Sequence, residues 1–291
     1  MVSKFVVAVY LITILLVNML LIVVICVNRS LHEPMYMFLC SLFVNELYGS
    51  SGLFPFLLVQ VLSDVHTVSV PLCFLQIVCL YSYAKVEFCN LAVMSFDRYV
   101  AICRPLQYHT IMTHFTVLIL IVLTWLYSFM TFMITLSLTL RLTLCKNVLN
   151  NVYCLNHQIV KLACSDTRLN FIYGLFGTVL SVLVPLLTIL FSYIKILHVC
   201  CVGSRQTRQK AVGTCAPHLA SLLNFSFGCL FEIFQNRFDT MEVPSVLKIT
   251  MSLYFVVLQP LLNPIVYGMR VSKIQTACKR FFFKKKLTEL V

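Results

Sequence analysis

Ionisable residues are scarce in this chain. Of its 291 residues only 11% are charged and 60% are hydrophobic, whereas a soluble domain is typically about 25% charged. With so few charges the outer surface must face lipid, which excludes a soluble globular protein. The apolar runs also lack the two-residue alternation of a β-barrel. We therefore expect an all-α membrane protein, because helices satisfy their own backbone groups in lipid.

Two other absences narrow the function. The seven histidines are scattered over loops and span ends, and no cluster of nucleophiles or metal ligands is visible, so we expect no enzyme and no catalytic residue. No internal repeat is apparent either, although secondary transporters are usually built from paired repeats. A transporter of small molecules stays an alternative, which an uptake assay would separate from the other readings.

Seven apolar stretches are long enough to cross a bilayer, which takes about 20 residues. The first lacks a cleavage site and is followed directly by the second, so we interpret it as a span and not as a signal peptide. All seven belong to one domain, residues 1–291. The expected spans are 5–27, 35–59, 73–103, 114–140, 170–199, 211–235 and 246–268.

The basic residues predict the orientation. The formal net charge is +12, and lysine and arginine concentrate in the loops after the first, third and fifth spans and in the tail. The loop after the fifth span is expected to carry Arg205, Arg208 and Lys210. A basic excess marks the cytoplasmic side of a membrane. We therefore place the tail in the cytoplasm and the amino terminus outside, and we expect no nucleic acid as a partner.

Four of the fourteen cysteines lie on the assigned outer side, where disulfides persist. Cys73 is at the start of the third span, and Cys145, Cys154 and Cys164 are in the loop 141–169. Two bridges are expected, and the residues alone leave three pairings open.

A charged triplet, Asp97-Arg98-Tyr99, lies near the end of the third span. Charge at such a position is costly unless it is paired or functional. We interpret the triplet as the cytoplasmic switch of a signalling helix bundle.

Five sequence motifs, in order along the chain, resemble those of rhodopsin-like class A G-protein-coupled receptors and, within them, olfactory receptors. The resemblance covers nearly the whole chain. The motifs are Leu31-His32-Glu33-Pro34-Met35-Tyr36, the Asp97-Arg98-Tyr99 string, Ser192-Tyr193, the run from Lys210 to Leu219, and the run from Pro260 to Tyr267.

The resemblance implies bridges between Cys73 and Cys154 and between Cys145 and Cys164. It also implies a small-molecule odorant in the outer half of the bundle and a stimulatory olfactory-type heterotrimeric G protein that raises cAMP. The expected location is the plasma membrane of sensory-neuron cilia. A non-olfactory class A receptor is the alternative, although an amine receptor is disfavoured because Leu80 stands where its aspartate is expected.

The same resemblance assigns roles at the inner end. Asp97 would hold Arg98 at rest, and Arg98 would move towards Tyr193 and Tyr267 on activation. Prolines weaken a helix locally, so Pro260 and Pro264 are candidate hinge residues or the cause of a static kink. The expected switch residues are Asp97, Arg98, Tyr99, Tyr193, Asn263, Pro264 and Tyr267.

Two carboxyl groups, Glu46 and Glu87, fall near the middle of spans two and three. Intramembrane carboxylates normally face the bundle interior. With Asn18 and Asn263 they form a plausible polar cluster, for which the resemblance suggests a sodium ion; hard cations prefer such oxygen ligands. The alternative is that one or both carboxyl groups are protonated, since burial disfavours the charged form.

Basic side chains in the outer half indicate ligand chemistry. Lys85 lies about 200° round the helix from Glu87, so it faces spans four to six with Tyr81. Arg237 is at the outer end of span six and suits a carboxylate. If Lys85 and Arg237 both contact the ligand, we expect an acidic odorant. If Glu232 also points into the bundle, the odorant could be an amino-acid-like zwitterion. Snorkelling of Lys85 and headgroup contact of Arg237 are the alternatives.

The remaining candidate pocket residues are small or apolar, as in most small-molecule sites. They are equally credible as helix-packing residues. The expected ligand-binding set is Tyr81, Ala84, Lys85, Thr178, Ser181, Ser226, Cys229, Leu230, Glu232, Arg237 and Val256, with Gly177 nearby.

After the seventh span, apolar residues recur at helical spacing among basic ones. This pattern predicts an amphipathic helix over about 270–283 on the inner membrane surface. Lys284, Lys285 and Lys286 are expected to contact anionic lipid. Cys278 is either palmitoylated or a free thiol.

Overall fold

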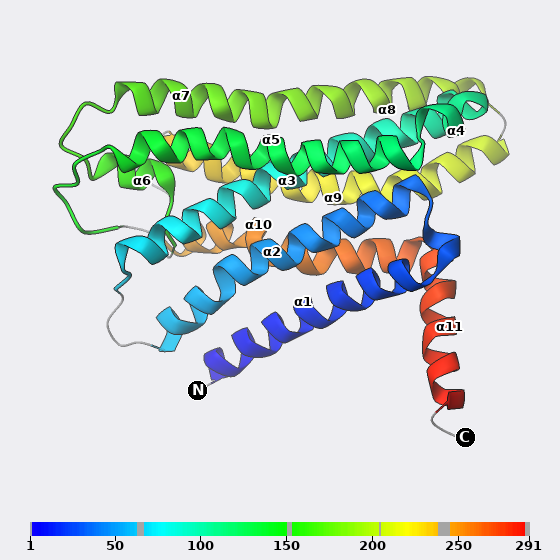
Figure 1. Ribbon diagram of the computed structural model, residues 1–291, viewed down its shortest axis with the longest axis horizontal. Helices are drawn as coiled ribbons and strands as arrows, with labels where there is room; N and C mark the ends of the chain where they lie inside the picture. Colours follow the sequence, from blue (N-terminus) through cyan, green and yellow to red (C-terminus); the bar gives the residue numbers. More distant parts are fainter. Residues whose placement is uncertain (1, 63–66, 150–152, 204, 238–244, 289–291) are drawn as a thin grey trace.

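Long helices make up almost all of the computed structural model, which describes residues 2–62, 67–149, 153–203, 205–237 and 245–288. Within these ranges there is no β-strand, and a single bridge joins Leu144 to Ala163. The expected all-α fold is therefore confirmed. The long helices run roughly side by side along the longest axis of the molecule (Figure 1).

Seven helical rods in the described residues correspond to the seven expected spans, each close to its predicted range. The fifth is one continuous rod of three pieces, in which η3 is a π-helical turn. The rods are α1 (Val2–Val27), α2 (Pro34–Leu62), α3 (Val70–Cys103), α5 (His114–Leu140), α7 (Arg168–Thr178) with η3 (Val179–Leu183) and α8 (Val184–Val202), α9 (Arg205–Arg237), and α10 (Ser245–Arg270).

Five of the rods are long and apolar enough in their described residues to cross a membrane by themselves: Val7–Val27, Pro34–Gln60, Val70–Cys103, His114–Leu140 and Arg168–Val202. α9 and α10 carry more polar side chains, and these bond to one another. Asn224 donates to Gln259 over 2.5 Å, and Ser221 donates to Asn263 over 2.6 Å. Polar groups paired in this way need not face lipid.

One expectation about the loops is wrong. Arg205 and Arg208, predicted in the loop after the fifth span, belong to the first turns of α9. Arginine, lysine and glutamine are good helix formers, so the helix extends beyond the apolar run that marks the span. The other connections hold short helices that apolar patterning does not reveal: η1 (Arg29–Leu31), η2 (Pro105–Gln107), α4 (Tyr108–Ile111) and α6 (Asn156–Lys161).

α2 and α3 approach closely because two glycines face α3. A Cβ atom added to Gly49 would overlap the ring of Tyr83, and one added to Gly52 would overlap Cys79. Small residues of this kind let helices pack tightly in a membrane. The contact brings the carboxyl groups of Glu46 and Glu87 within reach of shared partners.

α10 stays helical across both of its prolines. Pro264 has no N–H, so the carbonyl of Pro260, four residues earlier, lacks its usual helical donor. Asn18 of α1 supplies it, with Nδ2 at 2.9 Å from the Pro260 oxygen. The donor that Pro264 lacks is therefore replaced from α1.

The predicted amphipathic helix is α11 (Ser272–Thr288). It is turned away from the direction of the bundle and lies at the end opposite α6 and the amino terminus (Figure 1). Ile274 and Ala277 are buried with Leu31 and Met35 of the first loop and α2. Lys273 donates to Glu33 over 2.6 Å, and this bond raises the pKa of Lys273.

Cys278 is partly buried against the same cluster, and burial raises the pKa of its thiol. The side chains of Lys284, Lys285 and Lys286 lie outside the described residues.

Candidate functional site

Two disulfides fix the loop between α5 and α7. The structure joins Cys73 to Cys154 and Cys145 to Cys164, with Cα atoms 5.5 and 5.7 Å apart. These are the two pairs that the resemblance implies. Gln76 strengthens the first connection, since its Oε1 accepts the N–H of Cys154 over 2.8 Å.

The loop helix α6 is also anchored by side chains. Thr139 of α5 donates to Asn156 Oδ1 over 2.9 Å, and Asn170 of α7 donates to Thr139 Oγ1 over 3.3 Å. These bonds hold α6 beside the carboxyl-terminal end of α5 and the amino-terminal end of α7, where it closes one end of a cavity.

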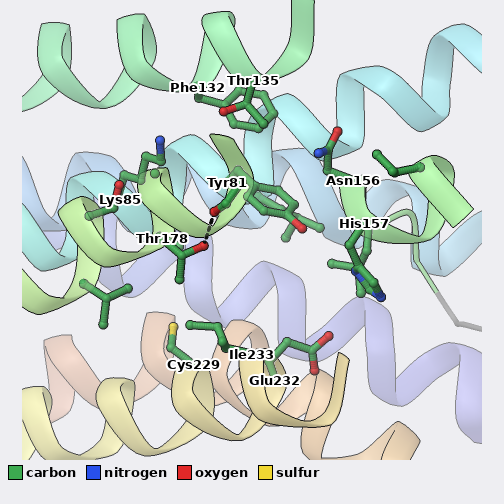
Figure 2. A pocket seen from close by; sticks show the side chains of 18 of the residues that line it. Tyr81, Lys85, Phe132, Thr135, Asn156, His157, Thr178, Cys229, Glu232 and Ile233 are labelled. Atoms are coloured by element: carbon green, nitrogen blue, oxygen red, sulfur yellow. Dashed lines mark hydrogen bonds between the residues drawn. The ribbon is translucent and has the colours of Figure 1, made fainter. Parts of the chain in front are cut away.

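The cavity has a volume of about 380 Å³ and lies between α3, α5, α6, α7 and α9. Of the expected ligand-binding residues, the structure places on its wall Tyr81, Ala84, Lys85, Thr178, Ser181, Cys229 and Glu232, with Gly177. Figure 2 shows Lys85 and Thr178 at one end and His157 and Asn156 towards the other. This volume is within the range of small-molecule sites.

Two expected pocket residues do not line this cavity. Leu230 is 49% exposed on the outer face of α9, because it lies about 100° round the helix from Cys229, which points inward. Ser226 is partly buried, but it is not among the lining residues. The side chains of Arg237 and Val256 lie outside the described residues.

Sequence reasoning missed much of the wall, especially residues from the loop between α5 and α7 and from α7 itself. Most of these side chains are apolar or uncharged and carry no distinguishing signal in a chain that is apolar throughout, and the charged one, Lys161, lies in a loop where a lysine is unremarkable. The missed residues are Leu80, Phe88, Phe132, Thr135, Tyr153, Leu155, Asn156, His157, Val160, Lys161, Thr167, Asn170, Phe171, Gly174, Val182 and Ile233.

Lys85 faces α5, as its position relative to Glu87 predicts. Its Nζ donates to Thr131 Oγ1 over 3.0 Å and lies 6.0 Å from the centre of the Phe132 ring. The side chain is only 9% exposed. It is therefore directed into the bundle and does not reach towards the membrane surface.

The two buried carboxyl groups meet at one amide. Asn263 Nδ2 donates to Glu46 Oε1 and, over 2.9 Å, to Glu87 Oε1. Tyr83 donates to Glu46 over 3.0 Å, and Asn45 donates to Glu87 over 2.9 Å. All five side chains are fully buried.

This cluster differs from the expected one in its members. Asn18 bonds to the backbone of Ile14 and Pro260 and to neither carboxyl group, because it replaces the donor that Pro264 lacks. Gln259 takes its place and donates to Glu87 over 3.3 Å. Asn45, Tyr83 and Gln259 escaped prediction because amides and a phenol in apolar helices look like isolated packing residues.

Near the carboxyl-terminal end of α3, Asp97 is fully buried and holds Arg98, whose Nε lies 2.9 Å from Oδ2. Tyr108 of α4 donates to the other oxygen, Oδ1, over 2.8 Å. Burial and the nearby Asp97 raise the pKa of Tyr108, so its phenol keeps the proton that it donates. Tyr108 was not predicted, because it lies outside the triplet.

Tyr193 is engaged elsewhere. Its hydroxyl lies 2.5 Å from Nδ1 of His218, and Nε2 of His218 lies 2.9 Å from the carbonyl oxygen of Leu91. Only a protonated Nε2 can bond to that carbonyl, so a neutral ring accepts the Tyr193 proton at Nδ1. His218 thus connects α9 to α3 and α8.

Tyr267 is fully buried beside Leu21 and Met94, in a different cluster from Tyr193. Tyr99 is partly buried against the cluster that contains Tyr193, with its ring 6.0 Å from Phe191. Arg98 is thus paired with Asp97, while Tyr193 is bonded to His218 and Tyr267 packs among apolar side chains. This is the arrangement expected at rest.

Comparison with known proteins identifies the family. The olfactory receptor family model matches residues 6–285. The chain belongs to the olfactory receptor family. It is 35% identical to human olfactory receptor 10A6 over 279 residues, which cover 95% of this chain and 88% of that one. Mouse olfactory receptor 4B13 is 35% identical over 278 residues, covering 95% and 89%.

Human olfactory receptor 51G1 is likewise 35% identical over 278 residues, covering 94% of this chain and 86% of that one. With nearly full-length matches to receptors, the chain is a multi-pass membrane receptor and not a secondary transporter.

Proposed function

We propose that this receptor binds a small odorant in the cavity between α3, α5, α7 and α9 and activates a stimulatory olfactory-type G protein, which raises cAMP. The cavity supports this most directly, because it lies among the outer halves of the helices while the Asp97–Arg98 pair is intact at the inner end. We place the receptor in the plasma membrane of sensory cilia, with the amino terminus outside.

The mechanism requires two states of the inner half. A ligand shifts such an equilibrium only by binding one state better than the other. At rest Asp97, which also accepts a hydrogen bond from Tyr108, restrains Arg98, and His218 restrains Tyr193. In the active state α9 moves outward, Arg98 turns towards Tyr193 and Tyr267, and the cleft admits the G protein.

The ligand is acidic or amino-acid-like in this proposal. Lys85 places a buried ammonium group on the cavity wall, and Glu232 lies on the wall formed by α9 (Figure 2). A buried charge is costly unless it is paired, so a ligand of opposite charge gains from binding there. Arg237 would act at the outer rim.

A screen of carboxylic acids, amino acids, amines and neutral volatiles, with cAMP output in transfected cells, tests the function. We expect agonists among the acids and loss of every response in Arg98→Ala at equal surface expression. The proposal would be contradicted if none of the tested compounds raised cAMP through a receptor present at the cell surface. It would also be contradicted if Arg98→Ala left the response unchanged.

We further propose that the cluster around Glu46 and Glu87 holds a sodium ion that stabilises the resting state. The residues suit an oxygen-bound cation: beside the two carboxyl groups, Asn45 Oδ1 is buried without a hydrogen-bond partner in the described residues. A shared proton is the alternative. Replacing sodium by a large organic cation should raise agonist affinity in the unmodified receptor and leave it unchanged in the double variant Glu46→Gln/Glu87→Gln. Equal agonist affinity of the unmodified receptor in the two cations would contradict the sodium site.

A further inference from the structure

Among the residues that the structure describes, the hydrogen-bond partner of the Lys85 ammonium group is a neutral hydroxyl. Thr131 accepts one of its three N–H groups, and the Thr131 hydroxyl proton is itself directed to the Tyr127 carbonyl over 2.8 Å. In the described part of the chain, the ion pairs do not include Lys85. Two of the three N–H donors of this ammonium group are therefore left for whatever fills this end of the cavity.

Apolar side chains make up much of the wall around Lys85, and the Phe132 ring lies 6.0 Å from its Nζ. Ala84, Phe88, Phe132 and Val182 share the cavity wall with it. A hydrocarbon chain gains from contact with these side chains, whereas a second charged group would lose its water without compensation.

Glu232 is too distant to serve the same end of a small ligand. The rings of Phe88 and Phe225 are 5.0 Å apart, which sets α3 and α9 in register. From that level Lys85 is three residues outward and Glu232 seven, so Glu232 lies roughly 6 Å farther out along the bundle. The two are also on different walls, since Lys85 reaches towards α5 (Figure 2).

We propose that Lys85 and Thr131 form a carboxylate subsite, in which the ligand is a monoanionic acid with an apolar tail. The subsite discriminates against α-amino acids, whose ammonium group would be held next to that of Lys85 with no carboxylate to receive it. Thr131 is a positioning residue that fixes the direction of the ammonium group. This inference rests on the proposed function and narrows the ligand class given there.

Thermal stabilisation of the purified receptor by ligand provides a test that does not depend on signalling. The probes are a series of straight-chain carboxylates, the matching α-amino acids and the matching primary alcohols. The variants are Lys85→Met, Thr131→Val and Thr131→Ser. Thr188→Val is the matched control, because Thr188 makes the same bond to a backbone carbonyl four residues earlier but is exposed on the outside of α8.

Carboxylates should bind the unmodified receptor, and α-amino acids of the same length should bind at least tenfold more weakly. Loss of one charge-assisted hydrogen bond weakens binding roughly 10- to 100-fold, so we expect that effect on carboxylates in Lys85→Met. Thr131→Val should weaken carboxylates several-fold and leave alcohols unchanged, while Thr131→Ser and Thr188→Val should retain normal affinity.

Equal affinity for acids and α-amino acids, or unchanged acid binding in Lys85→Met, would overturn the subsite. Equal losses for acids and alcohols in Thr131→Val would show a merely structural role for this threonine. Binding that follows the predicted order without any cAMP response would support the subsite and refute the G-protein coupling, so the two failures are distinguishable.

Discussion

The bond between Asp97 and Arg98 predicts that the substitution Asp97→Asn raises the ligand-independent activity of the receptor. The carboxylate of Asp97 is fully buried and accepts from Arg98 on one oxygen and from Tyr108 on the other. Asparagine has nearly the same shape but no charge. A hydrogen bond to a charged group is worth about 1.5–3 kcal/mol, and each 1.4 kcal/mol changes an equilibrium about tenfold. The equilibrium constant between the resting and active states should therefore shift roughly 10- to 100-fold towards the active state.

The assay is ligand-independent cAMP production, normalised to receptor at the cell surface. Asp97→Asn should raise it, because the resting state alone contains the bond that is lost. Tyr108→Phe removes one of the hydrogen bonds to the same charged group and leaves the bond to Arg98 in place, so it should raise the basal signal by no more than Asp97→Asn does. An unchanged or lower basal signal in Asp97→Asn, or a larger effect in Tyr108→Phe, would refute this account of the resting state.

Three further predictions concern the scaffold. Gly49→Ala should lower the melting temperature of the purified receptor by several degrees, because its Cβ overlaps the Tyr83 ring and overpacking costs about 1–3 kcal/mol; unaltered melting would contradict the close α2–α3 contact. Glu33→Lys and Lys273→Glu should each increase proteolysis of the tail, and the double variant should restore protection; two additive losses would argue against the pair. Cys145→Ser should reduce surface expression and acid affinity together, and normal values of both would show that this bridge does not hold the cavity wall.

Much of the fold follows from the sequence because a membrane helix has a local signal that needs no knowledge of its neighbours. A run of apolar residues long enough to cross the bilayer predicts a rod, and each of the seven predicted ranges corresponds to one. Helical geometry also predicts correctly that Lys85 and Glu87 face different partners: Lys85 bonds to α5, and Glu87 bonds to α2 and α10.

The rest depends on contacts between helices, which spacing along one helix does not determine. The rotation of α9 decides that Cys229 lines the cavity and Leu230 does not. The assignment of Asn18 to the carboxyl cluster fails for a similar reason. Its partner is a carbonyl that Pro264 leaves without a donor, and this vacancy is visible only when α1 and α10 are placed side by side.

The central claim is that a molecule in the outer cavity moves the inner end of α9. Double electron–electron resonance between spin labels near Arg104, at the end of α3, and Gln209, exposed on α9, measures this movement directly. With an agonist from the screen and the stimulatory G protein, the distance should increase, and Lys85→Met should abolish the increase for acids. A distance distribution that stays the same when agonist and G protein bind would contradict the account.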